Sequence, residues 1–166
     1  MNESALLALL PRLRRYARAL TGLRAEADDL VQDTLERAWS RAAQFHAGAD
    51  LRVWLFAIMH NLWASQQRRP RLPLRQLETA DLDFPTRATQ GDQLALADLA
   101  CALQQLPEDQ QAVLLLVSLE EMSYAEVAQT LGVPQGTVMS RISRARQRLR
   151  ELLDNTPPPA RLRVVR

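Results

Sequence analysis

The segment 123–150 constrains the fold more than any other part of the chain. Ser123 and Glu126 have the Ser-x-x-Glu spacing of a capping box, which predicts the start of a short helix. Gly132 is expected to end that helix, because glycine accepts the positive φ that a tight turn requires. A longer helix is predicted over Gly136–Leu153. A short capped helix, a glycine turn and a longer arginine-rich helix are typical of a helix-turn-helix.

The longer helix of this motif predicts a surface that reads duplex DNA. Its residues Val138 and Ile142 can pack on Val127 of the first helix, so its polar residues face outward. Short polar side chains and arginine are the groups that reach base edges and phosphates. We expect DNA contacts from Thr137, Ser140, Arg141, Ser143, Arg144 and Arg146. The alternative is a solvated arginine-rich helix with no ligand.

The remainder of the chain is also expected to be helical. Only 5% of the residues are aromatic and only 5 are glycine, while 47% are hydrophobic and mostly Ala and Leu, which favours helices over strands. Apolar residues at helical spacing predict helices over 2–19, 25–43, 51–67, 93–105 and 108–119. Asp50 is placed to cap the third helix, and Pro11 is expected to kink or divide the first.

The distribution of prolines and charges divides the chain into two small helical domains. Residues 1–69 are predicted to form the first domain and residues 93–155 the second. Residues 70–92 hold three prolines and no sustained period, which indicates a flexible linker. Residues 156–166, with three consecutive prolines, are expected to form a flexible tail.

Composition argues against an enzyme. Two histidines, one cysteine and no glycine-rich phosphate loop leave no recognisable catalytic site, so we expect no cofactor, no metal and no small-molecule substrate. The single Cys101 excludes an internal disulfide and is expected to be buried and inert. No apolar stretch is long enough for membrane insertion, so a cytoplasmic protein is expected.

Three segments, in order, resemble one family. Residues 119–150, with Ser-Tyr-Ala-Glu-Val-Ala at 123–128 and Gly-Thr-Val-Met-Ser-Arg at 136–141, resemble region 4 of the extracytoplasmic-function (ECF) sigma factors of the sigma-70 family. Residues 28–39 resemble region 2.2, and residues 54–62 resemble regions 2.3 and 2.4. The sequence of residues 50–56 is similar to that of ECF sigma factors of the general stress response type. The resemblance implies a sigma factor that binds core RNA polymerase and directs promoter-specific transcription initiation.

The resemblance also implies roles for residues of the first domain. Residues expected to bind core polymerase are Asp29, Leu30, Gln32, Asp33 and Glu36, whereas Asp28 is expected only to favour the helix dipole. The loop that captures a flipped base of the −10 element corresponds to Phe45, His46, Ala47, Gly48 and Ala49. Asn61 corresponds to a pocket residue, Arg68 and Arg69 suit phosphates, and Trp54 and Trp63 are expected in the core.

For the second domain the resemblance implies recognition of the −35 element in the major groove. Met139 departs from the family pattern, because many relatives carry Arg or Lys at that position. Its side chain could contact a thymine methyl group or pack within the protein, so the −35 sequence cannot be carried over from a relative.

The resemblance further implies an anti-sigma factor that inhibits the protein by wedging between the two domains. Two other functions stay open at this point. One is an ordinary helix-turn-helix regulator whose N-terminal half dimerises. The other is a sigma-like decoy that binds regulators and does not initiate transcription.

Overall fold

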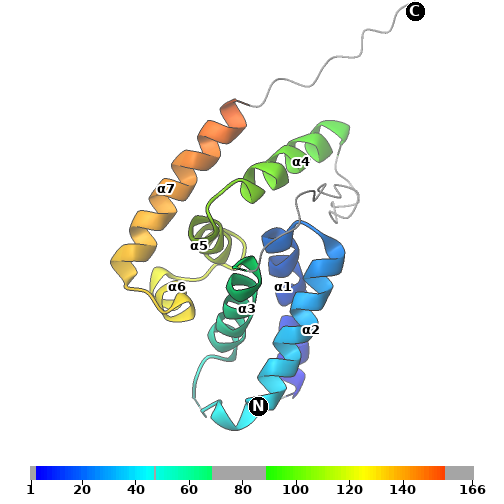
Figure 1. Cartoon of the computed structure of the whole chain (residues 1–166), viewed down its shortest axis with the longest axis vertical. Coiled ribbons are helices and arrows are strands. Elements are labelled where there is room, and N and C mark those ends of the chain that lie inside the picture. The colour runs from blue at the N-terminus through cyan, green and yellow to red at the C-terminus, as the bar shows by residue number, and fades with distance from the viewer. Residues whose placement is uncertain (1–2, 47, 69–88, 156–166) are drawn as a thin grey trace, which may run out of the picture.

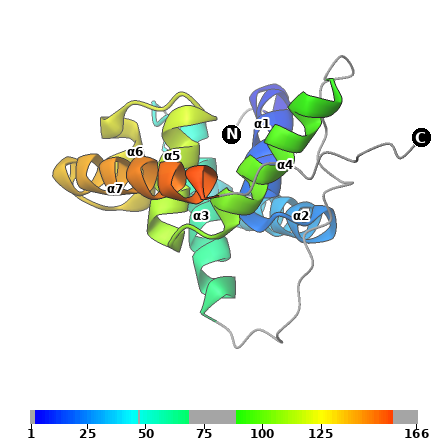
Figure 2. The same ribbon diagram turned by 90° about the horizontal axis from the view of Figure 1, so that it is seen from above.

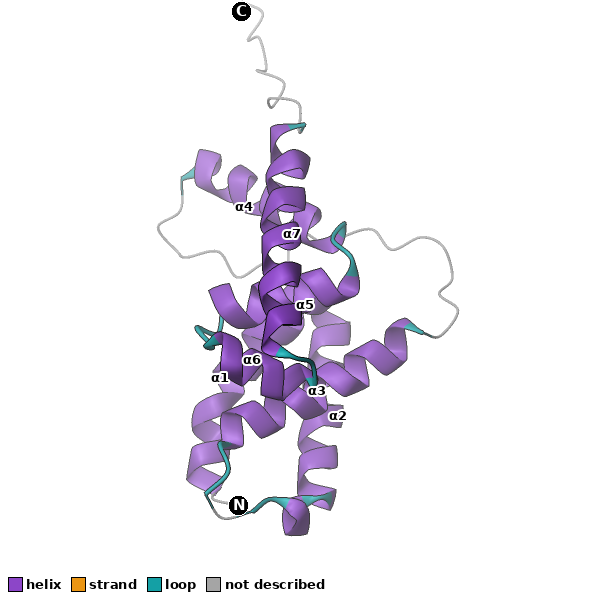
Figure 3. Cartoon of the chain, turned by 90° about the vertical axis from the view of Figure 1, so that its left-hand side faces the viewer, coloured by secondary structure: helices purple, strands orange, loops and turns teal. Residues whose placement is uncertain are grey.

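The computed structural model describes residues 3–46, 48–68 and 89–155, and all regular structure in these ranges is helical (Figure 1). In chain order the elements are α1 (Glu3–Thr21), α2 (Arg24–Ser40), the 3-10 turn η1 (Ala42–Gln44), α3 (Leu51–Gln67), α4 (Gln90–Gln104), α5 (Glu108–Ser118), α6 (Tyr124–Leu131) and α7 (Gln135–Asp154). The predicted all-α class is confirmed, as the view coloured by secondary structure makes plain (Figure 3).

Capping residues explain where several helices begin and end. The Asp50 carboxylate accepts hydrogen bonds from the backbone N–H groups of Arg52 and Val53, at 2.8 and 3.4 Å, so α3 begins where predicted. The predicted capping box at α6 is present, with Ser123 and Glu126 bonded reciprocally. Gly132 ends α6 in the left-handed conformation, with φ at +65°.

One predicted boundary was wrong. A second capping box, formed by Thr89 and Asp92, begins α4 at Gln90, so residues 90–92 belong to a helix and not to the linker. Of the two outcomes expected at Pro11, division of the helix is excluded, because Pro11 lies inside a continuous α1. The rest of the expected linker, residues 69–88, and the expected tail, residues 156–166, lie outside the described residues.

The first three helices enclose a core built on large side chains. Tyr16 and Phe56 meet edge to face, with ring centroids 5.1 Å apart, and both are fully buried. Trp63 is buried as predicted, and Trp54 is half-buried. Burial of the wholly apolar Phe56 side chain stabilises the fold by about 1.5–3 kcal/mol. Trp39 of α2 lies outside this core and is 67% exposed.

The helix-turn-helix forms part of the second half. Val127 of α6 and Val138 and Ile142 of α7 are buried together, as predicted from their spacing. Helix α5 packs against α7 and α6, and α4 contacts α7. Cys101 of α4 is half-buried, and so is less enclosed than expected.

The two halves pack directly on each other. Helices α5, α6 and α7 gather on one side and α1 and α2 on the other (Figure 2), and α1 contacts α5 while α3 contacts α6. Buried residues of both halves belong to one hydrophobic cluster. The side-chain amide of Gln111 in α5 donates to the carbonyl oxygens of Ala19 and Leu20 at the end of α1, at 3.2 and 3.3 Å. An inhibitor wedged between the halves is therefore not compatible with this closed arrangement.

Candidate nucleic-acid interface

Helices α6 and α7 meet with the geometry of a helix-turn-helix. The backbone N–H of Val133 donates to the carbonyl of Ala128 at 3.1 Å, which closes the turn after Gly132. Val138 and Ala145 are fully buried, so one face of α7 is fixed against the core. The opposite face of α7 is then held in a defined orientation toward solvent.

The exposed face of α7 carries most of the predicted DNA-reading residues. Ser143, Arg144 and Arg146 are exposed, and Thr137 and Ser140 are half-buried. The Ser140 hydroxyl donates to the carbonyl oxygen of Thr137 at 3.0 Å, so its hydrogen is directed back to the helix. This face therefore offers arginine guanidinium groups and the short hydroxyls of Thr137 and Ser143, neither of which is hydrogen-bonded to another described residue.

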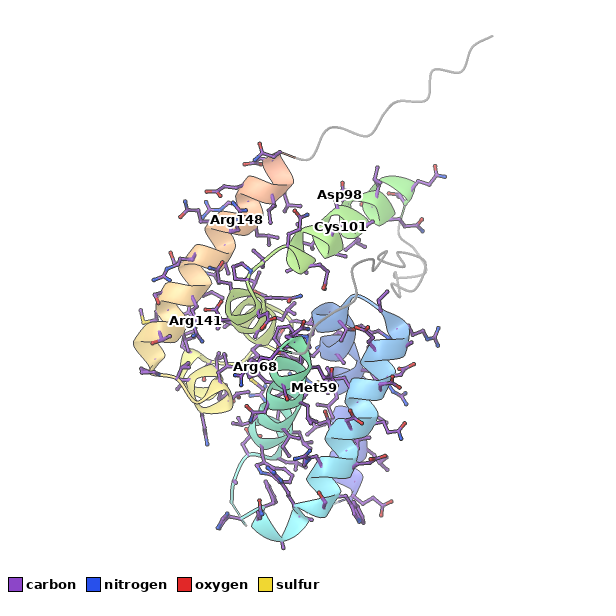
Figure 4. All side chains as sticks on the ribbon, viewed as in Figure 1. Met59, Arg68, Asp98, Cys101, Arg141 and Arg148 are labelled. Atoms are coloured by element: carbon purple, nitrogen blue, oxygen red, sulfur yellow. The ribbon has the colours of Figure 1, made fainter. Side chains whose placement is uncertain are left out.

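Arg141 is placed differently from the other predicted residues. Its Nε lies 3.1 Å from a carboxylate oxygen of Asp109 in α5, and its side chain is only 26% exposed. Figure 4 shows Arg141 on α7 at the side where this helix meets its neighbours, while Arg148 lies further along the same helix. Arg141 thus joins α7 to α5 and is less available to a phosphate than expected.

The charge of Arg141 also acts on His60 of α3, in the other half of the molecule. Burial first, and then the positive charge of Arg141, lowers the pKa of His60 to about 4. The Nδ1 atom of His60 is buried and has no hydrogen-bond partner among the described residues, and the imidazole lies against Trp63, with ring centroids 5.9 Å apart. His60 is accordingly uncharged at neutral pH.

Trp54, Asn61 and Arg68 lie in one stripe along α3 and its C-terminal end. Phe45, in the loop before α3, packs on Trp54 with ring centroids 5.1 Å apart. Asn61 and Arg68 follow Trp54 at successive spacings of seven residues, which is about two helical turns each, and both are exposed. An aromatic pair, an amide and a guanidinium in line are the groups that stack on, read and neutralise single-stranded DNA.

Of the other residues predicted to contact the −10 element, the structure describes only some. His46, Gly48 and Ala49 are exposed on the short connection between η1 and α3. Ala47 and Arg69 lie outside the described residues.

The residues predicted to bind polymerase occupy the outer face of α2, with one exception. Asp29, Gln32, Asp33 and Glu36 are exposed, and the Gln32 amide donates to the Glu36 carboxylate at 2.9 Å. Leu30 is fully buried in the core and so cannot belong to that surface. Trp39, near the end of the same helix, adds an exposed aromatic side chain.

A group of ion pairs between the halves was not predicted, and we call it the clasp. The fully buried carboxylate of Glu120, between α5 and α6, lies 2.8 Å from Nε of Arg12 and 3.1 Å from Nη2 of Arg15, both on α1. Arg52 of α3 pairs with Glu126 of α6 and donates to the carbonyl oxygen of Glu120 at 3.3 Å. No local pattern could reveal it, because Arg12 and Glu120 are 108 positions apart.

Glu126 serves the clasp and the helix cap together. Hydrogen bonds from the backbone and hydroxyl of Ser123 hold the pKa of the Glu126 carboxyl below its ordinary value, and Arg52 adds to this effect. The carboxylate that begins α6 thus also ties α6 to α3.

The described residues contain no group of three or more His, Cys, Asp or Glu that could hold a metal ion. None of their helices is both long enough and apolar enough to cross a membrane.

Comparison with known proteins assigns family models to both halves. Residues 6–60 match the Sigma2 domain of PhyR, and residues 96–149 match sigma-70 region 4. The chain is 39% identical to the ECF RNA polymerase sigma factor EcfG of Rhodopseudomonas palustris, over 89% of this chain and 82% of that protein. It is 36% identical to the ECF sigma factor SigE of Mycolicibacterium smegmatis, over 86% of this chain and 57% of that one.

Solved structures show the same fold over nearly the whole chain. The sigma factor RpoE of Bartonella quintana, in complex with the anti-sigma factor NepR, matches with a TM-score of 0.74 and 38% identity, covering 93% of this chain and 98% of RpoE. CnrH in complex with the cytosolic domain of CnrY matches with a TM-score of 0.70 and 30% identity, over 94% and 92% of the two chains. The anti-anti-sigma factor PhyR of Bartonella quintana shares the fold at 17% identity, with a TM-score of 0.61 over 89% of this chain and 49% of PhyR.

Proposed function

The chain belongs to the extracytoplasmic-function RNA polymerase sigma factors, and we propose that its two helical halves divide promoter recognition between them. As a sigma factor it binds core RNA polymerase and directs promoter-specific transcription initiation. We assign polymerase binding and the −10 element to residues 1–69, and the −35 element to residues 90–155, which start where α4 begins. The observation that carries this assignment is the exposed, arginine-bearing face of α7, which is held outward by the buried residues of a helix-turn-helix.

In this proposal α7 enters the major groove of the −35 element. Arg144 can fork onto the O6 and N7 atoms of a guanine, and Arg146 can neutralise a phosphate. Ser143 lies one turn before Arg146 on the same exposed face and can reach a base edge. Arg141, which is bonded to Asp109, orients α7 on α5 and contributes to DNA binding chiefly through its charge.

The stripe on α3 is proposed to hold the melted −10 strand. A base that leaves the duplex loses its stacking partners, and an aromatic surface such as the Phe45 and Trp54 pair can replace them. Asn61 offers an amide that can donate to and accept from a base edge, and Arg68 a charge for the backbone. Nothing in this role requires a catalytic residue, because the sigma factor holds the base and does not change it.

The outer face of α2 is proposed to bind core polymerase. Its three carboxylates, Asp29, Asp33 and Glu36, suit a basic surface on the partner, and Gln32 adds a directional hydrogen bond. Polymerase is found in the cytoplasm, so we expect the protein to act there.

We further propose that an anti-sigma factor binds the closed arrangement and holds it shut. The −10 and −35 elements are centred about 25 base pairs apart, which is roughly 85 Å of B-form DNA. In the closed arrangement Arg52, just after the −10 loop, contacts Glu126 of the helix-turn-helix, so the two reading surfaces are much too close to occupy both elements. The likeness to RpoE and CnrH, both determined with anti-sigma partners, supports this proposal because it spans both halves.

Run-off transcription with core polymerase on a promoter library tests the proposed function. We expect transcripts from a subset of promoters that share −10 and −35 elements. Failure to transcribe from any promoter, with core polymerase bound normally, would overturn it in favour of a sigma-like decoy. Binding as a symmetric homodimer to a palindrome, without affinity for polymerase, would favour an ordinary regulator.

The assignment of α7 has its own test. Arg144→Ala should lower initiation about tenfold or more at promoters that depend on the −35 element, the value of one bidentate guanine contact, while core binding stays unchanged. Arg148→Ala is the matched control, because it removes the same charge from the same helix one turn further from its start. Loss of core binding by Arg144→Ala would show that the roles of the two halves are wrongly assigned.

A further inference from the structure

Met139 is the large apolar side chain that the described part of α5, α6 and α7 leaves exposed, at 53% of its surface. Its neighbours in sequence and on the following turn, Val138 and Ile142, are buried in the core of the helix-turn-helix. The core of α7 is therefore already complete without Met139. Of the two roles that the sequence left open for this residue, packing within the protein is excluded.

The position of Met139 places it at the reading end of α7. It lies in the second turn of a helix that begins at Gln135, and the N-terminal residues of such a helix are the ones that approach base edges. Side chains on a helix lean toward its N-terminus, so the side chain of Met139 lies toward the first turn of α7. Gly136 has no side chain, and no atom lies within 4 Å of where its Cβ would be.

The residues around Met139 leave its side chain free to contact a base at the N-terminal end of α7. Ser140 directs its hydroxyl hydrogen to the Thr137 carbonyl and so can offer a base only an acceptor oxygen. Gly136 offers only backbone, which lets the first turn of α7 approach the floor of a groove closely. Arg146, about two turns further on the same side of α7, is placed to bind a neighbouring phosphate.

The chemistry of the major groove then limits what a methionine can recognise. Its thioether is only a weak acceptor and cannot replace an arginine or a glutamine in reading a base edge. Among the four bases only thymine presents an apolar group in the major groove, its C5-methyl. Methionine is flexible and polarisable, which suits contact with a single methyl group.

We propose that Met139 is a specificity residue that recognises the C5-methyl group of one thymine in the −35 element. The proposal rests on the proposed function, and it adds one base identity that is read by apolar contact. It predicts a promoter preference that differs from that of relatives with a cation at this position.

The test replaces thymine by deoxyuridine, which removes the methyl group and leaves hydrogen bonding intact. With the full chain bound to core polymerase, each −35 thymine of an active promoter is replaced in turn, and initiation is measured. We expect one position at which the wild-type protein loses about fourfold, the value of one buried methyl group. Met139→Ala should be weaker on the thymine promoter by a similar factor and should not distinguish thymine from deoxyuridine at that position.

A second variant separates recognition from general apolar contact. Met139→Gln keeps the length of the side chain but replaces the thioether by an amide, so it should also lose the preference for thymine at that position and gain relative activity with adenine. Because Met139 is exposed, neither variant should change the thermal unfolding midpoint. Equal sensitivity of the wild-type and Met139→Ala proteins to deoxyuridine at every position would overturn the proposal.

These outcomes are distinguishable from failure of the proposed function. If the wild-type protein initiates normally and Arg144→Ala still lowers initiation, while no deoxyuridine position matters, only the role of Met139 is refuted. If the wild-type protein does not initiate from any promoter, the proposed function itself has failed and so has the inference that depends on it.

Discussion

The carboxylate of Glu120 is fully buried and lies 2.8 Å from the guanidinium of Arg12, which comes from the opposite half of the molecule. The same guanidinium also donates to the Glu120 carbonyl oxygen at 2.7 Å. The negative charge is therefore compensated only while the halves stay together. The cost of separating them depends on what each group of the clasp meets when its partner leaves.

This relationship predicts that the two sides of the clasp respond differently to mutation. Arg12→Met should destabilise the closed arrangement by about 3 kcal/mol, because a buried carboxylate then loses its nearest counter-charge. Glu120→Gln should cost less, because the arginines it releases are already 33% and 52% exposed and can turn to water. Small-angle X-ray scattering would report opening as a larger radius of gyration. A larger effect for Glu120→Gln would contradict this account.

A second prediction concerns acid sensitivity. His60 has a pKa of about 4 in the folded protein against an ordinary 6.5, so between these values the unfolded chain binds more protons. The contribution of neutral His60 to stability is full above about pH 6.5 and is lost progressively as the pH falls toward 4, by up to about 3 kcal/mol. Urea unfolding across this range should show that slope, and His60→Gln should flatten it.

The other histidine of the chain provides the control for this experiment. His46 is exposed, and His46→Gln should leave the slope between about pH 4 and 6.5 unchanged. At the acid end of the range Glu126 adds a loss of its own, because its pKa is lowered and its contribution disappears as it is protonated. A slope that persists undiminished in His60→Gln would exclude His60 as its source.

A third prediction concerns two glycines that both have room for a Cβ atom but differ in backbone conformation. Gly132 has φ at +65° with no atom near the position of a Cβ, so Gly132→Ala should destabilise by about 1–2 kcal/mol through backbone strain alone. Gly136 has equally open surroundings but lies in the first turn of α7, without a positive φ. Gly136→Ala should be neutral or stabilise by up to about 1 kcal/mol. Chemical denaturation measures both, and equal effects would refute the argument.

A fourth prediction tests the polymerase-binding face of α2. Asp33→Asn removes a charge from that exposed face and should weaken binding to core polymerase about fivefold, mainly through a slower association rate at low salt. Asp28→Asn is the matched control, since Asp28 is equally exposed on the same helix and lies 4.0 Å from Arg24. Equal losses in the two variants would indicate a general charge effect and no specific surface.

Local sequence signals predicted the helix-turn-helix well. Ser123, Glu126 and Gly132 act within a few residues of one another, so their spacing alone determines the start and end of α6. The Thr89 and Asp92 box acts over the same short range, so the sequence also carries a local signal for the start of α4, directly after a proline-containing segment.

Side-chain exposure was harder to predict than helix position. Leu30 and Trp39 are both apolar residues of α2, yet one is fully buried and the other is largely exposed. The three-residue and four-residue spacings of a helix leave the edges of the apolar stripe undefined, and only the neighbouring helices decide them. The Arg141–Asp109 pair and the clasp could not be predicted for the same reason, because tertiary contacts leave no signature in the local spacing of residues.

The buried Glu120 limits how the N-terminal and C-terminal halves of related proteins can be exchanged. A C-terminal half that carries this glutamate can be grafted only onto an N-terminal half that supplies arginines at the positions of Arg12 and Arg15. Chimeras that respect this match should close normally, whereas mismatched ones should stay open and escape a regulator that requires the closed form. Glu120 and its arginine partners must therefore occur together, and the two promoter-reading halves of this protein cannot be exchanged independently.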